Sequence, residues 1–148
     1  MKSITSKWFI AKVSYEKTAD DGTTEKVVTE QYVINAEMFG EAESRILEEL
    51  AQYVSTELNV CGLAIAPFSE VFFSEDNVAD NWYKTKIQII TIDERAGREK
   101  KTPVFYLVQA TCLEDARKNI DDVLKTMMFD YSIAEIKETK IIDVFTWK

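Results

Sequence analysis

The sequence contains no histidine in its 148 residues. Without histidine the chain cannot build a Ser-His-Asp or Cys-His nucleophile system or a histidine-ligated zinc site, and it lacks the commonest general base near neutral pH. Two cysteines are too few for a four-cysteine zinc site, and four isolated glycines form no GxGxxG or Walker-type phosphate loop. We therefore expect no catalytic residues, no metal site and no cofactor, and we predict that the protein is not an enzyme.

Long apolar runs and flexible stretches are also missing. No run of about 18 apolar residues occurs, so no membrane-spanning helix is expected. Residues 1–8 lack the apolar core of a secretory signal. Four glycines and two prolines leave little scope for long linkers. Cys61 and Cys112 fit reduced thiols, and we predict a cytoplasmic protein that does not bind membranes.

The net charge is −8, and it is divided unequally along the chain. Residues 1–74 hold 6 Lys and Arg against 12 Asp and Glu, a charge of −6, whereas residues 75–148 hold 12 against 14, a charge of −2. An acidic surface repels phosphate backbones at long range, which disfavours duplex binding. Any anion-binding surface is therefore expected in the second half.

An internal repeat organises the sequence. At an offset of 74, segment 8–13 aligns with 82–87 and segment 32–36 with 106–110, and at an offset of 73 segment 71–72 aligns with 144–145. We interpret this register as a duplication within a single domain of residues 1–148, with one repeat at about 6–74 and the second at about 80–148. The alternative is that two similar stretches share only their periodicity.

Each repeat begins with two alternating, β-branched and aromatic segments that predict a hairpin. In the first repeat these strands are expected at 7–15 and 26–35, around a turn at Asp20, Asp21 and Gly22. In the second they are expected at 81–92 and 102–110, around a turn at 93–97.

A helix is predicted after each hairpin, because apolar residues then recur every three or four positions. The apolar positions are Phe39, Ala42, Ile46, Leu50 and Tyr53 in the first repeat, and Leu113, Ala116, Ile120, Val123, Leu124 and Met127 in the second. Thr111 and Glu114 predict a capping box. Further β-like stretches follow at 59–73, which Pro67 should divide, and at 132–146, and residues 74–80 form a polar connector.

The sequence thus predicts an α+β fold of two layers: a mainly antiparallel sheet with two helices on one face, built from internally duplicated strand–strand–helix–strand units. Such a sheet leaves its other face open, and that face alternates Trp and Lys. The candidate binding surface consists of Trp8, Lys12, Trp82, Lys84, Lys86, Arg98 and Lys101. It would suit stacked bases and phosphates, a protein interface, or an ordinary wet surface in which Lys stems cover Trp rings.

Several segments in combination resemble the family described as domain of unknown function 4494. They are residues 32–36, 40–46, 70–76, 99–102, 107–110 and 143–145. The resemblance covers nearly the whole chain and implies a short protein of gut-type bacteria and their phages. It implies no activity and provides no functional residues.

We therefore predict a non-enzymatic interaction module that self-associates through the open sheet face or a strand edge, with a protein partner or a homo-oligomer as the outcome. The alternative is a single-stranded nucleic-acid-binding protein of phage or mobile-element type, because residues 60–129 also fit four short strands followed by a helix. A carboxylate-based or small-molecule-binding enzyme would instead need a deep pocket with paired carboxylates or a buried lysine.

Overall fold

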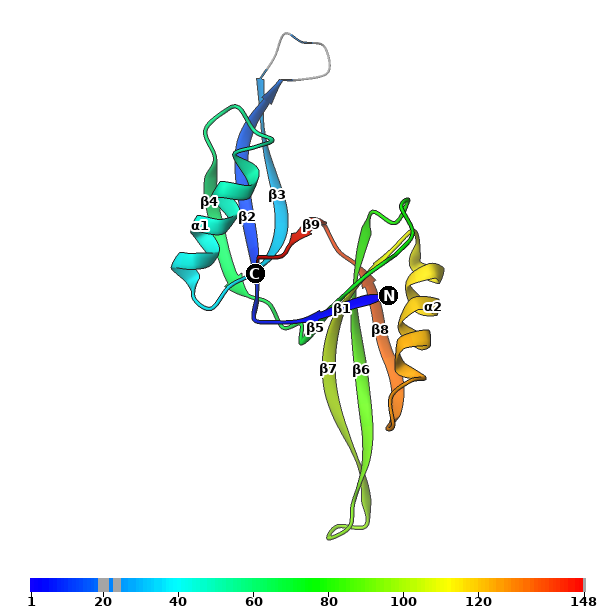
Figure 1. Ribbon diagram of the computed structural model, residues 1–148. Coiled ribbons are helices and arrows are strands. Elements are labelled where there is room, and N and C mark those ends of the chain that lie inside the picture. Colours follow the sequence, from blue (N-terminus) through cyan, green and yellow to red (C-terminus); the bar gives the residue numbers. More distant parts are fainter. Residues whose placement is uncertain (19–21, 23–24, 148) are drawn as a thin grey trace. The chain divides into compact units, whose positions relative to one another are not determined.

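A computed structural model describes residues 1–18, 22 and 25–147 (Figure 1). Over these residues the chain forms two helices and nine strands, which confirms the α+β class. In chain order they are β1 (Lys2–Thr5), β2 (Trp8–Thr18), β3 (Glu25–Asn35), α1 (Phe39–Leu50), β4 (Asn59–Ile65), β5 (Glu70–Phe73), β6 (Asn81–Asp93), β7 (Arg98–Ala110), α2 (Leu113–Leu124), β8 (Asp130–Glu138) and β9 (Ile141–Phe145).

The chain forms two compact units, each with its own sheet and one helix. Unit 1 consists of Met1–Thr5 and Pro67–Thr139, and its five strands lie in the order β1-β5-β7-β6-β8. Unit 2 consists of Ser6–Ala66 and the segment that begins at Lys140, and its four strands lie in the order β4-β2-β3-β9. The expectation of one sheet carrying both helices is therefore replaced by two sheets, because each hairpin pairs with its own set of neighbours.

The central hairpins form as their alternating residues predict. β2 and β3 pair antiparallel in unit 2, and β6 and β7 do so in unit 1. The β6–β7 turn closes where Gly97 adopts a φ of 62° and donates its N–H to the carbonyl oxygen of Asp93 at 2.8 Å. Glycine reaches this left-handed conformation without steric strain. The first predicted turn lies outside the described residues except for Gly22.

Each helix lies against its own sheet, and Figure 1 shows α2 beside β8. α1 contacts β2, β3 and β4, and α2 contacts β7 and β8. The buried side chains are Ala42, Ile46 and Leu50 in α1, and Ala116, Ile120 and Leu124 in α2. Each helix has 12 residues, about 18 Å of rise. Neither described helix is long and apolar enough to cross a membrane.

The capping box predicted at the start of α2 is corrected by the structure. Cys112, not Thr111, is the N-cap residue. The carboxylate that reaches back belongs to Asp115, not Glu114, and it accepts the N–H of Thr111 at 2.9 Å. α1 repeats this bond, because Glu41 accepts the N–H of Glu37 at 3.2 Å. An acidic group in the first turn also complements the helix dipole.

In each hairpin the face opposite the alternating Trp and Lys residues packs under the helix. In unit 2 the buried cluster joins β2 and β3 to α1, and it comprises Phe9, Ala11, Val13, Tyr32, Ile34, Ala36, Ala42, Ile46 and Leu50. In unit 1 the main cluster comprises Phe72, Ile87, Tyr106, Val108, Ile120 and Leu124. The alternation of the strands thus identified the face that meets the helix.

The last strand of each predicted repeat lies in a different unit from the hairpin of that repeat. β5 follows β4 in the chain but pairs in parallel with β7 of unit 1, and β9 follows β8 but pairs in parallel with β3 of unit 2. The registers correspond: Val71 pairs with Leu107, and Val144 pairs with Val33. Pro67 separates β4 from β5, as predicted. The polar connector 74–80 lies within unit 1, so the chain passes between units elsewhere.

Candidate functional site

The two tryptophans of the predicted binding surface are buried. Trp8 and Trp82 are each 1% exposed. The ring of Phe73 packs edge-on against Trp82 with ring centroids 5.5 Å apart. Burying a large aromatic side chain is favourable wherever neighbouring residues can cover it. The alternating Lys residues had suggested a solvent-exposed face. Neither ring is offered for stacking with a base.

The basic residues of that prediction separate into two units and two faces. Lys12 is exposed in unit 2, whereas the others lie on the β6–β7 hairpin of unit 1. Lys86 pairs with Phe105, and Ile90 pairs with Lys101. Residues directly opposite in an antiparallel pair share a face, so strand alternation puts Lys84, Lys86 and Lys101 on one side. Arg98 pairs with Asp93 and points to the other side.

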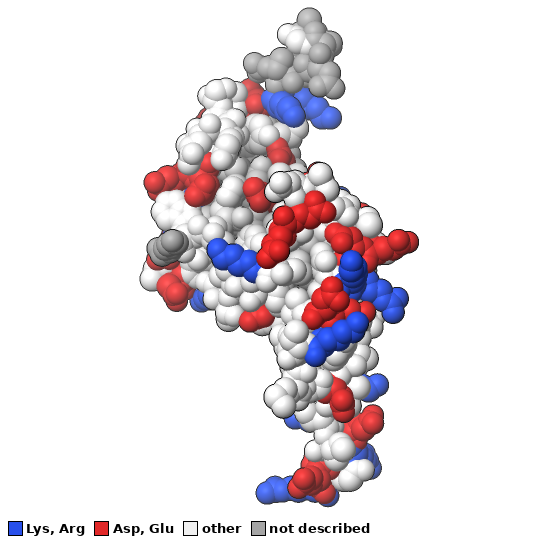
Figure 2. Space-filling view, turned by 45° about the vertical axis from the view of Figure 1, so that its right-hand side comes forward, with Lys and Arg blue, Asp and Glu red and all other residues white. Residues whose placement is uncertain are grey.

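Charges of both signs accompany these basic residues. Figure 2 shows Lys, Arg, Asp and Glu together at the tip of the β6–β7 hairpin. The ammonium group of Lys84 lies 4.9 Å from the centroid of the Phe105 ring, a cation–π contact that holds its side chain against the sheet. The hairpin therefore carries a mixed surface with three lysines on one face.

A groove runs between α2 and the edge strand β8 of unit 1. Its volume is about 370 Å³. The lining residues are Leu113, Glu114, Arg117, Ile133, Ala134, Glu135 and Ile136. Leu113 at the start of α2 is 52% exposed. An aliphatic groove beside an edge strand can receive the side chain of an extended segment that pairs with the strand.

A more polar groove of about 600 Å³ lies elsewhere on unit 1, beside β5 and α2. Four carboxylates line it, from Glu70, Glu75, Asp76 and Asp122. One of them, Glu70, accepts the hydroxyl hydrogen of Thr5 at 2.7 Å. No group of three or more His, Cys, Asp or Glu side chains is placed to hold a metal ion anywhere in the described residues.

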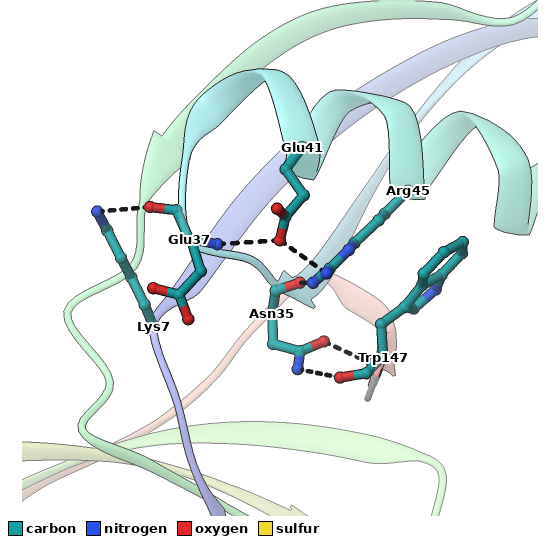
Figure 3. A network of polar contacts seen from close by, with 6 residues as sticks. All are labelled: Lys7, Asn35, Glu37, Glu41, Arg45 and Trp147. Carbon is teal, nitrogen blue, oxygen red and sulfur yellow. Dashed lines mark hydrogen bonds and ion pairs between the residues drawn. The ribbon is translucent and has the colours of Figure 1, made fainter.

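In unit 2 the C-terminal segment is held by an amide clamp, drawn in Figure 3. Asn35, the last residue of β3, accepts the N–H of Trp147 on its Oδ1 at 2.6 Å. Its Nδ2 donates to the carbonyl oxygen of Trp147 at 2.7 Å. The two bonds pair with the N–H and with the carbonyl oxygen of the same residue, as a neighbouring strand would. They fix the position of the chain just beyond β9.

The side chain of Trp147 is recognised as well. Its indole N–H donates to Glu49 of α1 at 2.8 Å, and the guanidinium of Arg45 lies 5.4 Å from its ring centroid. Arg45 also donates to the carbonyl oxygen of Asn35 at 2.6 Å and pairs with Glu41 at 2.7 Å. These contacts join α1, β3 and the C-terminal segment in one polar network.

The strand β9, which precedes Trp147, packs against an aromatic side chain of β3. The ring of Phe145 stacks on Tyr32 with centroids 5.5 Å apart. The hydroxyl of Tyr32 donates to Glu30 at 2.9 Å, and burial, reinforced by this bond, raises the pKa of Tyr32 above its ordinary value. Desolvation, with a smaller contribution from Glu49, also raises the pKa of the Asp143 carboxyl. The site thus favours an aromatic residue at position 145.

Unit 1 contains a related clamp, in which the side-chain amide bonds to two different residues instead of one. Gln109 stands 74 residues after Asn35 and accepts the N–H of Ser74, just beyond β5, at 3.0 Å. Its Nε2 donates to the carbonyl oxygen of Ala79 at 2.9 Å. Asn119, 74 residues after Arg45, donates to the carbonyl oxygen of Gln109 at 3.3 Å. The backbone is therefore held by a side-chain amide after β5 in unit 1 and after β9 in unit 2.

Sequence reasoning did not identify this clamp, although it aligned the segments that carry it. Asn35 and Gln109 fall at the same place in the repeat, next to last in 32–36 and 106–110. An amide at the end of two aligned strands was the available signal. What these residues can do is bind an extended backbone; they carry no nucleophile or proton-transfer group.

The comparisons with known proteins identify a family and add no activity. No curated protein and no solved structure matches the chain. One family matches nearly all of it, from residue 7 to residue 147, which includes both hairpins, both helices and both exchanged strands. The resemblance carried by the sequence motifs is thereby confirmed, and the chain belongs to the family described as Domain of unknown function (DUF4494).

Proposed function

We propose that the protein is a non-enzymatic interaction module that binds an extended segment of a partner polypeptide along β8. The observation that supports this best is the aliphatic groove between α2 and β8, at the edge of the unit 1 sheet. An edge strand offers main-chain donors and acceptors, and a groove beside it selects a side chain of the added strand. The two features together match strand addition.

The groove supplies the apolar part of the binding energy. Leu113 is half exposed, and Ile133 and Ile136 of β8 are partly buried. Covering an aliphatic side chain contributes about 1.5–3 kcal/mol. A partner segment with a bulky aliphatic residue facing the groove is therefore favoured over a wholly polar one.

Two features of β8 limit indiscriminate pairing. The β6–β8 register shifts between Lys86 and Ile87, which leaves Ala134 as an extra residue in β8. Charged residues, Glu135 and Lys137, follow this bulge. Bulges and charges are the usual means by which edge strands avoid aggregation, and they favour a partner of defined sequence.

The fold offers a precedent for such binding within the chain. β1 pairs antiparallel with β5 although 65 residues separate Thr5 from its partner Glu70, and β9 pairs with β3 from the far end of the sequence. Both sheets thus take up extended segments from distant parts of the chain at their edges. A segment of another polypeptide on β8 would extend the same principle.

A phage-displayed library of random peptides, panned on the immobilised full chain, tests the proposal. Enriched peptides are then measured as fluorescent probes against wild type, Leu113→Lys and the matched control Ile92→Lys, which makes the same change at an exposed residue of unit 1. We expect Leu113→Lys to weaken binding about tenfold or more, because ~1.4 kcal/mol of lost apolar burial has that effect. Ile92→Lys should bind as wild type.

Failure to enrich any peptide, or equal binding by Leu113→Lys, would sink the proposal. A dimer in light scattering that Leu113→Lys dissociates would identify the partner as a second copy of the chain. The setting we propose is a reducing, cytoplasmic compartment, in which the exposed and unpaired Cys61 and Cys112 remain thiols.

Single-stranded nucleic acid is the second candidate, favoured by one observation. Lys84, Lys86 and Lys101 share a face of the β6–β7 hairpin with the aromatic ring of Phe105. Lysines beside an aromatic ring suit a single strand. The burial of both tryptophans and the net charge of −8 weigh against it.

Titration of a fluorescent single-stranded oligonucleotide at low salt decides this candidate. Binding that falls at least about tenfold in Lys84→Glu with Lys86→Glu would support it, because each lost phosphate contact removes electrostatic affinity. The matched control is Lys118→Glu with Lys125→Glu, the same charge change on exposed residues at α2. Absence of binding by wild type would exclude the candidate.

We also infer that the two units arose by duplication. The supporting observations are the corresponding registers of β5 and β9 and the matching clamps at Asn35 and Gln109. The bulges correspond too, since the register shifts after Lys12 in unit 2 and after Lys86 in unit 1. Shared periodicity alone would not reproduce the same irregularity at the same place.

A further inference from the structure

The C-terminal strand reaches its binding site through a very short connection. β8 ends at Glu138 in unit 1, and β9 begins at Ile141 in unit 2, so only Thr139 and Lys140 lie between them. Thr139 is anchored to unit 1, because its N–H and its hydroxyl both donate to the carbonyl oxygen of Trp82, at 3.0 and 2.8 Å. The strand is thus attached to one unit and bound by the other.

The site in unit 2 recognises residues 141–147 through groups that this segment carries itself. The backbone pairs with β3 from Gln31 to Ile34, and Ile141 and Val144 are buried. The clamp of Asn35 holds the backbone of Trp147, as described above. Each of these contacts could be made equally by the same segment of another chain, because none requires that it be joined to the chain that binds it.

The fold already uses this exchange between its two repeats. β5 leaves its repeat for the unit 1 sheet and is clamped there by Gln109, and β9 leaves its repeat for the unit 2 sheet and is clamped by Asn35. A strand that leaves its own hairpin to complete another is the characteristic of domain swapping, which is a low-cost route to dimers.

We propose that two copies of the chain exchange residues 141–147, so that β9 of each copy pairs with β3 of the other. The contacts in the exchanged and the closed forms are the same. The balance therefore depends on protein concentration relative to the effective concentration of the tethered strand, which is on the order of millimolar for a short tether. The partner is a second copy, and the site is distinct from the β8 groove.

Two variants of the full chain, one weakened in the strand and the other weakened in its binding site, make the exchange measurable. One copy carries Trp147→Ala, which weakens its strand and leaves its site intact. The other carries Asn35→Ala, which weakens its site and leaves its strand intact. In a mixture the intact strand of the second copy gains most by entering the intact site of the first.

The two variants are tagged differently and mixed at ~1 mM to match the effective concentration of the tethered strand. They are then diluted and separated by size with light scattering and tag capture. We expect a 1:1 complex of the two variants, at about tenfold or more above the level in same-variant pairs, since a preference of ~1.4 kcal/mol gives that ratio. Leu113→Lys added to both copies should leave the complex unchanged, which separates this proposal from the β8 one.

Circular dichroism checks that each variant is folded. If Asn35→Ala unfolds the chain, Arg45→Met replaces it as the site variant, because it removes the guanidinium contacts and keeps the aliphatic stem. The proposal is overturned if folded variants form no mixed complex above the same-variant level. It is equally overturned if same-variant pairs form as much complex, because the contact then lies elsewhere.

Discussion

The side-chain amide of Asn35 brackets the backbone of Trp147, accepting its N–H at 2.6 Å and donating to its carbonyl oxygen at 2.7 Å. The two residues are 112 positions apart in sequence and fall in different predicted repeats. Their pairing fixes the C-terminal segment beside β3, where the indole of Trp147 reaches Glu49 and lies near Arg45. Asn35 therefore holds the chain directly after the last strand.

Asn35→Ala should lower the free energy of unfolding by about 1–3 kcal/mol, because it removes two hydrogen bonds to a partly buried backbone. Urea denaturation followed by fluorescence measures the change. The matched control is Asn77→Ala, at an exposed position in the 74–80 connector, which should stay within about 0.5 kcal/mol of wild type. Equal stability of the two variants would show that the clamp contributes little.

Gln109→Ala should have a comparable effect in unit 1. It removes the acceptor of the Ser74 N–H and the donor to the Ala79 carbonyl, so we expect a loss of about 1–3 kcal/mol. Gln88→Ala is the control, because it changes the same residue type on a neighbouring strand of the same sheet. If Gln109→Ala and Gln88→Ala lowered the free energy of unfolding equally, the bonds of Gln109 would resemble those of Asn35 in geometry without contributing to stability.

The local elements were readable from the sequence because their patterns are local. Alternation gave both hairpins, and spacings of three and four gave both helices, including the buried Ile46 and Ile120. Pro67 was placed correctly between two short strands. The N-cap of α2 was misplaced by one residue, because Thr111 and Glu114 have the right types, whereas Asp115 has the right geometry.

What sequence could not supply was the pairing of distant strands. Val71 and Val144 both lie in segments expected to be strands, yet nothing in their neighbourhoods indicates that β5 pairs with β7 and β9 with β3. A one-sheet arrangement and a two-sheet arrangement present the same local pattern. Trp8 and Trp82 were misjudged for a related reason, since burial is set by what packs on a face and not by the lysines that alternate along it.

Cleavage of the 74–80 connector should leave the two halves of the chain associated. A site-specific protease sequence inserted after Asn77 divides the chain between β5 and β6. The N-terminal fragment still supplies β1 and β5 to unit 1, and the C-terminal fragment still supplies β9 to unit 2. We expect the fragments to co-elute on size exclusion with the mass of the uncut insertion variant and to separate in denaturant.

The uncut insertion variant controls for the insertion itself. Separation of the fragments in native buffer would contradict the exchange of strands, because each half would then have completed its own sheet. If the complex persists on dilution, the strand pairing between the two fragments is strong enough to hold them together.

Asp143→Asn should stabilise the chain at neutral pH and lose that advantage in acid. Desolvation, with Glu49 nearby, raises the pKa of Asp143 in the folded state above its ordinary value. A carboxyl whose folded-state pKa is raised favours folding only while it is protonated, and this contribution is lost as pH rises through the folded pKa.

The amide of Asn is neutral at every pH. Its Oδ1 can still accept the N–H of Val144, which Asp143 Oδ1 accepts at 2.8 Å in the wild type. Thermal midpoints at pH 7 and at steps towards pH 4 should therefore show a gap that narrows as the pH falls, whereas Asp130→Asn, the same change at an exposed position at the start of β8, should change the midpoint little at pH 7. A gap that widens towards acid would contradict the prediction, because it would mean that the charged form of Asp143 stabilises β9.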